Sequence, residues 1–324
     1  MEVRIEPAIK PKVCILGGTG FVGGHLAAQL VEHGFTVRIP TRRPVRHRSL
    51  GVLQGASVVT ANIHEPGVLE DVLGGCDAVI NLVAILNEGR RGDFKRVHVD
   101  LVDRLSEACR RSGVRRLLHM SAMNASPQAK SAYLRSKGEG EDRAHAAEDL
   151  QVTSFRPSVI FGPNDHLFNR FAALLRCAPM LPLACPGARL SPVFVGDVVH
   201  ALRIALTNPD TAGQRYELCG PRVMTLEEIV RYAADVLQID KPIVPLGNGL
   251  SKLQARVLGM LPGRPFTMDN YLSLSVDAVC RDGFPAVFGI QPQPVEAVIP
   301  MYLGEANQRT QLAEARRAAR RSPN

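Results

Sequence analysis

The chain has 324 residues, of which 45% are hydrophobic and 22% charged, the balance of a folded protein of about two domains. No run approaches about 18 uninterrupted apolar residues and the first residues lack a signal-peptide core, so we expect neither a transmembrane helix nor a secretory signal. The net charge of +8 comes with only 5% aromatic residues and no recognisable nucleic-acid module, so we expect no nucleic-acid partner, and an anionic membrane or acidic protein surface is at least as good a candidate.

The first predicted element is a buried strand, residues 13–16, which breaks into a glycine-rich turn and continues as a helix. The glycines are spaced Gly17-x-x-Gly20-x-x-Gly23, unlike the G-x-G-x-x-G of two-domain dehydrogenases. Glycines at such a turn let a pyrophosphate approach the free N–H groups of a helix N-terminus. The turn is a candidate dinucleotide site that also includes Thr19, Phe21 and Val22, and an ordinary strand–helix connection is the alternative.

The second apolar run, residues 35–39, ends where a Rossmann fold places its ribose-reading residue. An NAD site would carry a carboxylate there, whereas this chain has Arg42 and Arg43. Guanidinium groups suit a 2′-phosphate through charge-assisted hydrogen bonds. We therefore favour NADP(H), with NAD(H) as the alternative cofactor and a solvated basic loop as the alternative structure.

Four further apolar runs alternate with helical patterns: residues 56–60, 78–84, 116–121 and 152–156. Between them, residues 98–112 have helical spacing of apolar side chains. Continuous rather than alternating apolar strands indicate a sheet that is buried on both faces. We predict an α/β fold, a Rossmann-type doubly wound parallel sheet, in residues 11–160.

Proline and glycine become frequent after Phe161, and the predicted elements become short. We expect extended segments at 189–195 and 214–218, and helices at 225–237 and 249–261. Residues 161–305 are predicted to form a smaller C-terminal substrate-side lobe with segments that return to the core. Residues 306–324 are predicted to form a basic C-terminal helix and tail.

Tyr133 and Lys137 are four residues apart on a predicted helix, so their side chains share one face. A phenol with its ordinary pKa of about 10 is a poor acid–base catalyst at neutral pH. A neighbouring ammonium favours the phenolate and lowers that pKa. The pair is thus a candidate catalytic unit, and its alternative role is to hold the ribose and nicotinamide of a cofactor.

These motifs together resemble the extended and atypical short-chain dehydrogenase/reductase superfamily, which includes NAD-dependent epimerases and dehydratases. The resemblance covers roughly residues 12–300 and rests on the glycine turn, Asn81-Leu-Val-Ala, Tyr133-x-x-x-Lys137 and Arg156-Pro-Ser-Val-Ile-Phe-Gly-Pro. Within it, residues 81–88, 94–99, 119–125, 131–141 and 156–165 are similar to the branch of the respiratory complex I alpha-subcomplex subunit nine and its bacterial relatives. In that branch the protein holds an NADPH beside the membrane arm and is regarded as structural or regulatory.

The resemblance also implies roles for single residues. Lys137 would hold the nicotinamide ribose, Asn62 would lie beside the adenine in place of an acidic residue, and His98 would replace a structural asparagine. Further cofactor contacts would come from Val83, Ala84, Pro157 and Val159. The carbonyl-polarising hydroxyl should follow the strand that ends at Met120; Ser121 is the candidate, and Ala122, Met123 and Asn124 carry no hydroxyl.

Two classes of function follow from these expectations. The first is an NAD(P)H-binding accessory or assembly factor, with a tightly held NADPH, for a quinone-reducing membrane-bound respiratory complex. The alternative is an active NAD(P)H-dependent oxidoreductase, epimerase or dehydratase that acts on a carbonyl, sugar or quinone-like substrate through Tyr133 and Lys137. Either protein would be cytoplasmic, and the first would be peripheral on the inner face of the membrane.

The predicted helix 249–261 has Leu250, Leu253, Val257 and Leu261 at helical spacing, with Lys252 away from that stripe. The ordinary interpretation is a helix that packs its stripe on the protein's own core. The alternative is an interfacial helix on a membrane, which the arginine-rich segment 310–321 would support by attraction to anionic lipid.

The seven cysteines are scattered without a C-x-x-C pair, and several lie in apolar runs. We expect them to be small core residues in a reducing compartment rather than a disulfide framework. The histidines show no metal-ligand spacing, so no metal site is expected.

Overall fold

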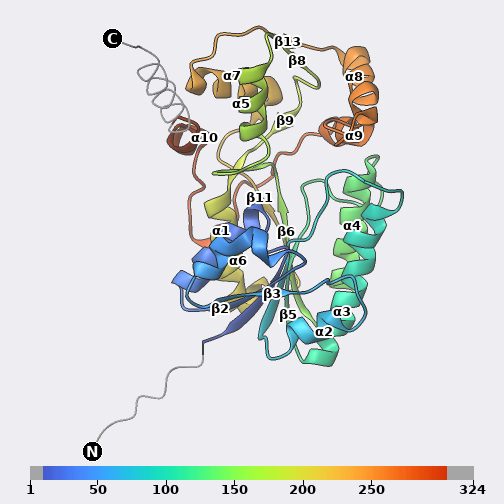
Figure 1. Ribbon diagram of the computed structural model, residues 1–324, viewed down its shortest axis with the longest axis vertical. Coiled ribbons are helices and arrows are strands. Elements are labelled where there is room, and N and C mark those ends of the chain that lie inside the picture. Colours follow the sequence, from blue (N-terminus) through green and yellow to red (C-terminus); the bar gives the residue numbers. More distant parts are fainter. Residues whose placement is uncertain (1–9, 305–324) are drawn as a thin grey trace, which may run out of the picture. The chain divides into compact units, whose positions relative to one another are not determined.

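The computed structural model describes residues 10–304, which form two compact units that alternate along the chain (Figure 1). The first unit consists of the chain before Ala122 together with Ser136–Phe155 and Val199–Tyr216. The second consists of Ala122–Arg135, Arg156–Val198 and the described chain from Glu217. The predicted helix at 310–321 lies outside the described residues.

A seven-stranded sheet with the order β11-β6-β5-β4-β1-β2-β3 is the centre of the first unit. Its strands are β1 Lys12–Leu16, β2 Thr36–Thr41, β3 Ala56–Thr60, β4 Ala78–Asn81, β5 Arg116–Met120, β6 Gln151–Pro157 and β11 Arg215–Leu218. The pairings from β3 across to β6 are all parallel. This order reverses direction between β1 and β4, as in a doubly wound Rossmann sheet, so the predicted fold class is confirmed.

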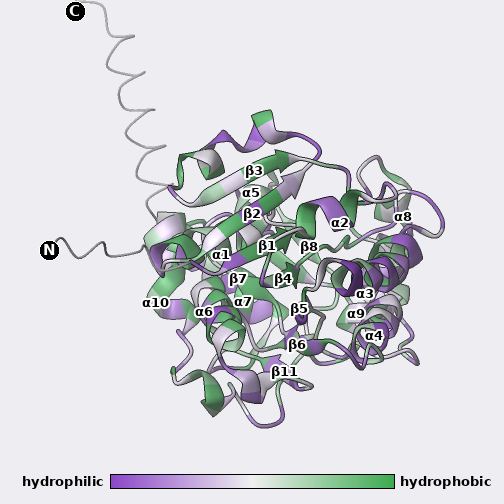
Figure 2. Ribbon diagram, turned by 90° about the horizontal axis from the view of Figure 1, so that it is seen from below, coloured by the Kyte–Doolittle hydropathy of each residue, from purple (hydrophilic) through white to green (hydrophobic). Residues whose placement is uncertain are grey.

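Helices cover both faces of this sheet. In both views, α1 Phe21–Glu32 and α6 Val195–Thr207 lie on one side, whereas α2 Val68–Leu73, α3 Leu101–Ser112 and α4 Ala132–His145 lie on the other (Figures 1 and 2). The strands β1, β4 and β5 are buried almost throughout, because apolar side chains leave on both faces and meet a helix on each.

The predicted helix 98–112 begins differently from the expectation. Lys95–Asp100 is a π-helical turn, and the α-helix starts only at Leu101. Next to this turn, a Cβ atom at Gly140 of α4 would lie 1.9 Å from the backbone oxygen of His98. Gly140 therefore lets α4 approach the π-turn more closely than any other residue would allow.

The second unit has short strands in two-residue and three-residue pairs. They are β7 Ile160–Phe161 with β10 Val193–Phe194, β9 Arg189–Leu190 with β12 Met224–Thr225, and β8 Leu181–Leu183 with β13 Ile243–Pro245. Its helices are α5 Phe168–Cys177, α7 Leu226–Leu237, α8 Asn248–Met260, α9 Met268–Leu274 and α10 Val295–Ile299. Phe161, Phe168, Ile229 and Ile299 belong to its buried core.

The expectation that the cysteines are small core residues is wrong for Cys177, which is exposed, and the expectation of no disulfide is wrong for one pair. Cys219 and Cys280 form a disulfide in the second unit, with their Cα atoms 5.9 Å apart. The segment with Cys280 is brought there by a backbone bridge between Ala278 and Leu190. Pairing over 61 residues of sequence is set by that tertiary path, which residue spacing does not reveal.

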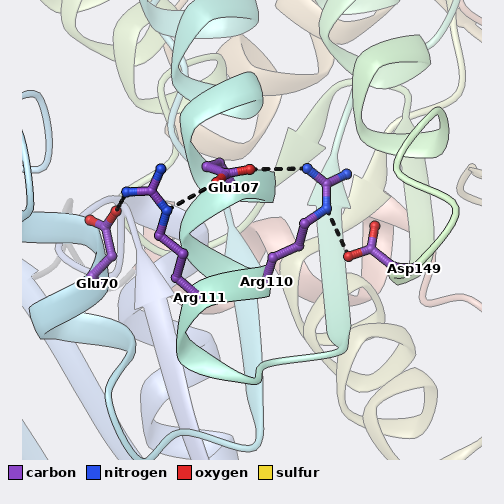
Figure 3. A network of polar contacts seen from close by, with 5 residues as sticks. All are labelled: Glu70, Glu107, Arg110, Arg111 and Asp149. Atoms are coloured by element: carbon purple, nitrogen blue, oxygen red, sulfur yellow. Dashed lines mark hydrogen bonds and ion pairs between the residues drawn. The ribbon is translucent and has the colours of Figure 1, made fainter.

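A network of five charged side chains ties α2, α3 and the segment before β6 together on the surface of the first unit (Figure 3). Glu107 accepts from Arg110 and Arg111, which also pair with Asp149 and Glu70 respectively. The hydrogen bonds from the arginines lower the pKa of Glu107. Because all five groups are exposed to a considerable degree, solvent and salt screen these pairs, and we assign the network little of the stability.

Candidate functional site

The glycine turn after β1 brings backbone close to backbone on two sides. Gly17 has a φ of +80°, and a Cβ atom there would lie 3.0 Å from the carbonyl carbon of Leu82. A Cβ atom on Gly23 would lie 2.5 Å from the oxygen of Gly17. Helix α1 follows, with Gly20 as its N-cap. Because glycine has no side chain, the N-cap accepts no side-chain hydrogen bond from the N–H groups of the first turn. This geometry fits a bound pyrophosphate.

A cavity of about 430 Å³ opens against this turn, which is the size range of small-molecule sites. The turn contributes Gly17, Thr19 and Gly20, and the segment after β4 contributes Leu82, Val83, Ala84 and Ile85. The cavity thus lies at the carboxyl ends of β1 and β4, where the strand order reverses.

A second cavity of about 740 Å³ shares Arg42 with the first. Its lining includes Arg38, Asn62, Glu65 and Asp71. Arg38 already donates to the backbone oxygens of Val72 and Gly74.

Arg42 is exposed, and its guanidinium forms no hydrogen bond or ion pair within residues 10–304, so it is an available cation at the end of β2. Arg43 lines neither cavity. The two arginines that the sequence treats alike therefore differ in position.

The smaller cavity also has charged lining residues that the sequence did not indicate, among them Asp93, which pairs with Arg96 at 2.8 Å. His64 and Arg96 line it, and Arg104 donates to the backbone oxygen of His64. Burial and the charges of Arg96, Arg104 and Arg42 lower the pKa of His64, so this imidazole is neutral. These residues come from three separate segments with no shared motif, and only the fold brings them together.

The amide of Asn62 is used locally. Its nitrogen donates to Glu65 at 2.8 Å, and its oxygen accepts from the backbone N–H of His64 at 3.3 Å. Asn62 thus shapes the turn after β3 while it lines the larger cavity.

Lys137 and Ser121 are both buried and both hydrogen-bonded within the first unit. Lys137 Nζ donates to the backbone oxygen of Met120, and burial lowers the pKa of this lysine to about 8, against the opposing effect of Glu141. Ser121 Oγ donates to Glu141 at 2.6 Å, and Arg215 pairs with the same carboxylate at 3.1 Å. For Ser121 to polarise a substrate carbonyl, it would have to give up this bond to a buried carboxylate.

Tyr133 lies on the first turn of α4, in the part of that helix that belongs to the second unit. Burial and the nearby Asp269 carboxylate raise the pKa of its phenol to about 12. The sequence predicts the opposite shift from a neighbouring ammonium. Asp269 also accepts from the backbone N–H groups of Ala132 and Tyr133, so one carboxylate both caps the helix and disfavours the phenolate.

His98 occupies a buried position between two parts of the site. Its Nε2 accepts from the N–H of Ile85 at 3.1 Å, which requires the proton to be on Nδ1, and Nδ1 then donates to Ser136 Oγ at 2.8 Å. Burial, with the charge of Lys137, lowers the pKa of His98 to about 3. His98 is therefore a neutral link between the cavity wall and the residue before Lys137.

The structure brings part of the predicted site together. Around the smaller cavity it gathers Gly17, Thr19, Gly20, Arg42, Val83 and Ala84. Gly23 lies beneath the turn, Phe21 and Val22 lie on the first turn of α1, and Pro157 and Val159 belong to the second unit. Among residues 10–304 no group of three histidine, cysteine or carboxylate side chains is arranged to hold a metal ion.

Comparison with known proteins agrees with this geometry. Residues 13–219 match the NAD dependent epimerase/dehydratase family. The chain is 28% identical to NADH dehydrogenase (ubiquinone) 1 alpha subcomplex subunit 9, mitochondrial, of Rattus norvegicus, over 87% of this chain and 77% of that protein. It is 31% identical to a ceramide reductase of Caulobacter vibrioides, over 69% of this chain and 70% of that protein.

Two solved structures share the fold. MoeE5 in complex with UDP-glucuronic acid and NAD aligns with a TM-score of 0.68 at 18% identity, covering 93% of this chain and 99% of that chain. UDP-glucuronic acid 4-epimerase from Bacillus cereus, in complex with UDP-glucuronic acid and NAD, aligns with a TM-score of 0.64 at 17% identity, covering 72% and 86%.

Proposed function

This chain belongs to the NAD dependent epimerase/dehydratase family, and from that premise we propose that it holds a nicotinamide dinucleotide as a tightly bound, structural cofactor. Its role is that of an accessory or assembly factor for a quinone-reducing respiratory complex. The glycine turn, the uncapped start of α1 and the cavity beside them support the binding half of this proposal.

The proposed cofactor is NADPH. Arg42 borders both cavities at the end of β2 and has no protein partner for its guanidinium within the described residues. A 2′-phosphate would supply the two oxygens that a guanidinium accommodates best.

The observation that carries the structural role is the hydrogen bond from Ser121 to Glu141. It occupies the one hydroxyl among residues 121–124, the segment after β5 where the carbonyl-polarising hydroxyl is expected. A substrate carbonyl would thus lack the donor that stabilises developing negative charge in the transition state, whereas the cofactor cradle does not depend on it.

The proposed partner follows from the relatives. A mitochondrial NADH dehydrogenase (ubiquinone) subunit matches over most of both chains, which supports a place beside a membrane-bound respiratory complex. The proposed location is cytoplasmic and peripheral, on the inner face of the membrane.

The first experiment is the dissociation rate of nucleotide from the purified chain, with the bound species identified by mass spectrometry. Because the chain has no tryptophan, the fluorescence of a reduced nicotinamide can be followed without that background. NADPH that co-purifies and leaves over hours is the expected result. Release within seconds would contradict a structural cofactor, since an enzyme must exchange its cofactor in every turnover.

An active reductase is the second candidate, because the relative from Caulobacter vibrioides is a ceramide reductase and Tyr133 and Lys137 are both present. In that case Tyr133 would pass the proton and Lys137 would hold the cofactor ribose. NADPH oxidation with ketone-containing lipids that is abolished by Tyr133→Phe, with nucleotide binding retained, would establish this candidate and overturn the purely structural role.

A further inference from the structure

Helix α8 packs against the second unit through small and polar side chains, not through its large apolar ones. Its buried residues are Ser251 and Ala255, which are 0% and 1% exposed. Ser251 accepts from the backbone N–H of Cys185 and donates to the backbone oxygen of Leu246. Small and polar side chains thus point inward, which lets the helix lie close to its neighbours within the second unit.

The large apolar side chains of the same segment point outward. Leu250 is 57% exposed, Leu253 55%, Val257 47%, Met260 78% and Leu261 46%. Their spacing of three and four residues makes one continuous stripe along a helix about 20 Å long. The ordinary interpretation from the sequence, that this stripe packs on the protein's own core, is wrong.

The charged side chains of this segment have one sign, and Lys252 Nζ lies 5.8 Å from the centroid of the Tyr271 ring. Lys252 and Arg256 are exposed on α8, Arg264 follows it, and there is no aspartate or glutamate between Asp240 and Asp269. A second copy of the chain on this face would bring like charges together. An aliphatic stripe without aromatic residues also lacks the anchors that dominate protein interfaces.

We propose that the five exposed apolar residues of α8 and its C-terminal end, flanked by Lys252 and Arg256, lie in the interfacial layer of an anionic lipid bilayer. The stripe would enter the boundary between headgroups and acyl chains, and the cations would meet lipid phosphates. None of the helices within residues 10–304 is long and apolar enough to cross a membrane, so this contact is one of surface binding. The inference deepens the proposed function by naming the surface that faces the membrane.

The test is flotation of the full chain with vesicles of phosphatidylcholine alone or of equimolar phosphatidylcholine and phosphatidylglycerol. The wild-type chain is expected to float with the anionic vesicles and to be released by salt. Val257→Glu should weaken binding at least about tenfold, because it puts a charge into the apolar layer. Val52→Glu is the matched control. Val52 is 80% exposed in the first unit, so this variant should bind vesicles as the wild type does.

A second variant tests the cations separately. Lys252→Gln with Arg256→Gln should weaken binding to anionic vesicles on the order of tenfold and leave binding to phosphatidylcholine unchanged. A wild-type chain that stays at the bottom of the gradient would overturn the proposal, as would Val257→Glu floating like the wild type. A dimer in sedimentation that Val257→Glu dissociates, without flotation, would assign the stripe to a second copy instead.

Circular dichroism and nucleotide content are measured on the same preparations. A folded Val257→Glu chain that keeps its nucleotide but no longer floats supports the membrane surface alone. A wild-type chain that floats but carries no nucleotide would instead count against the proposed cofactor role and leave the membrane surface supported.

Discussion

Arg42 and Arg43 are adjacent in sequence, and only Arg42 borders the cavities at the end of β2. We expect Arg42→Ala to weaken NADPH binding by roughly tenfold to a hundredfold, the effect of losing a charged hydrogen bond, and to change NADH binding little. Arg43→Ala is the matched control and should leave both affinities near those of the wild type. Fluorescence titration with the two reduced nucleotides measures this difference.

Equal losses of NADPH and NADH in Arg42→Ala would mean that this guanidinium does not contact the 2′-phosphate. An equal effect of Arg43→Ala on NADPH would mean that the loop after β2 rearranges when nucleotide binds.

His98 makes the stability of the chain sensitive to acid. Its pKa is about 3 in the folded chain, against 6.5 for an unperturbed histidine, so between these values the unfolded chain binds the proton and the folded chain does not. Stability is therefore lost as the pH falls below 6.5, by about 2 kcal/mol at pH 5 from this group.

His98→Asn should remove that part of the acid sensitivity. Asparagine can still accept from Ile85 and donate to Ser136, and it does not titrate. Urea unfolding of both proteins at pH 7 and pH 5 measures the difference, because other groups titrate alike in the two chains. An unchanged pH dependence in His98→Asn would show that the pKa of His98 is the same in the folded and the unfolded chain.

At the scale of elements, alanine substitutions at two neighbouring glycines of α1 distinguish the effect of close packing on stability from the effect of helix propensity. A Cβ atom on Gly23 would lie 2.5 Å from backbone atoms of Gly17 and Gly18, whereas one on Gly24 would meet nothing within 4 Å. Gly23→Ala should destabilise the chain by about 3 kcal/mol or more, because strand β1 and helix α1 must move apart. Gly24→Ala should stabilise it by about 0.5–1 kcal/mol. Urea denaturation compares them, and similar effects of the two substitutions would refute the close contact.

Most elements of the sheet could be predicted, because their apolar runs are short, continuous and bounded by glycine or polar residues. Strand β3 has the bounds that the sequence indicated, Ala56–Thr60. The orientation of α8 could not be predicted in the same way, because periodicity locates an apolar stripe without saying what covers it. The inward placement of Ser251 and Ala255 depends on neighbours that are distant in sequence.

The residues of the candidate site that follow the strands could be predicted, and the others could not. The glycines and Arg42 follow consecutive strands whose carboxyl ends meet at one edge, so their gathering follows from the fold. His64 and Arg96 enter the cavity from segments without a motif, and the bond from Ser121 to Glu141 joins residues 20 positions apart. Such contacts depend on side-chain directions that a single sequence does not specify.

At the scale of the whole molecule, the disulfide and the glycine turn of the proposed nucleotide site lie in different compact units. A crosslink that closes about 60 residues contributes about 4 kcal/mol through the entropy of the unfolded chain. Reductant should therefore lower amide protection in α7 of the second unit and leave α3 of the first unit protected, as measured by hydrogen exchange. Cys219→Ser with Cys280→Ser is the control, because reductant should not change its exchange. Equal loss of protection in α3 and α7 would contradict independent stability, since it would mean that the two units open in one cooperative step.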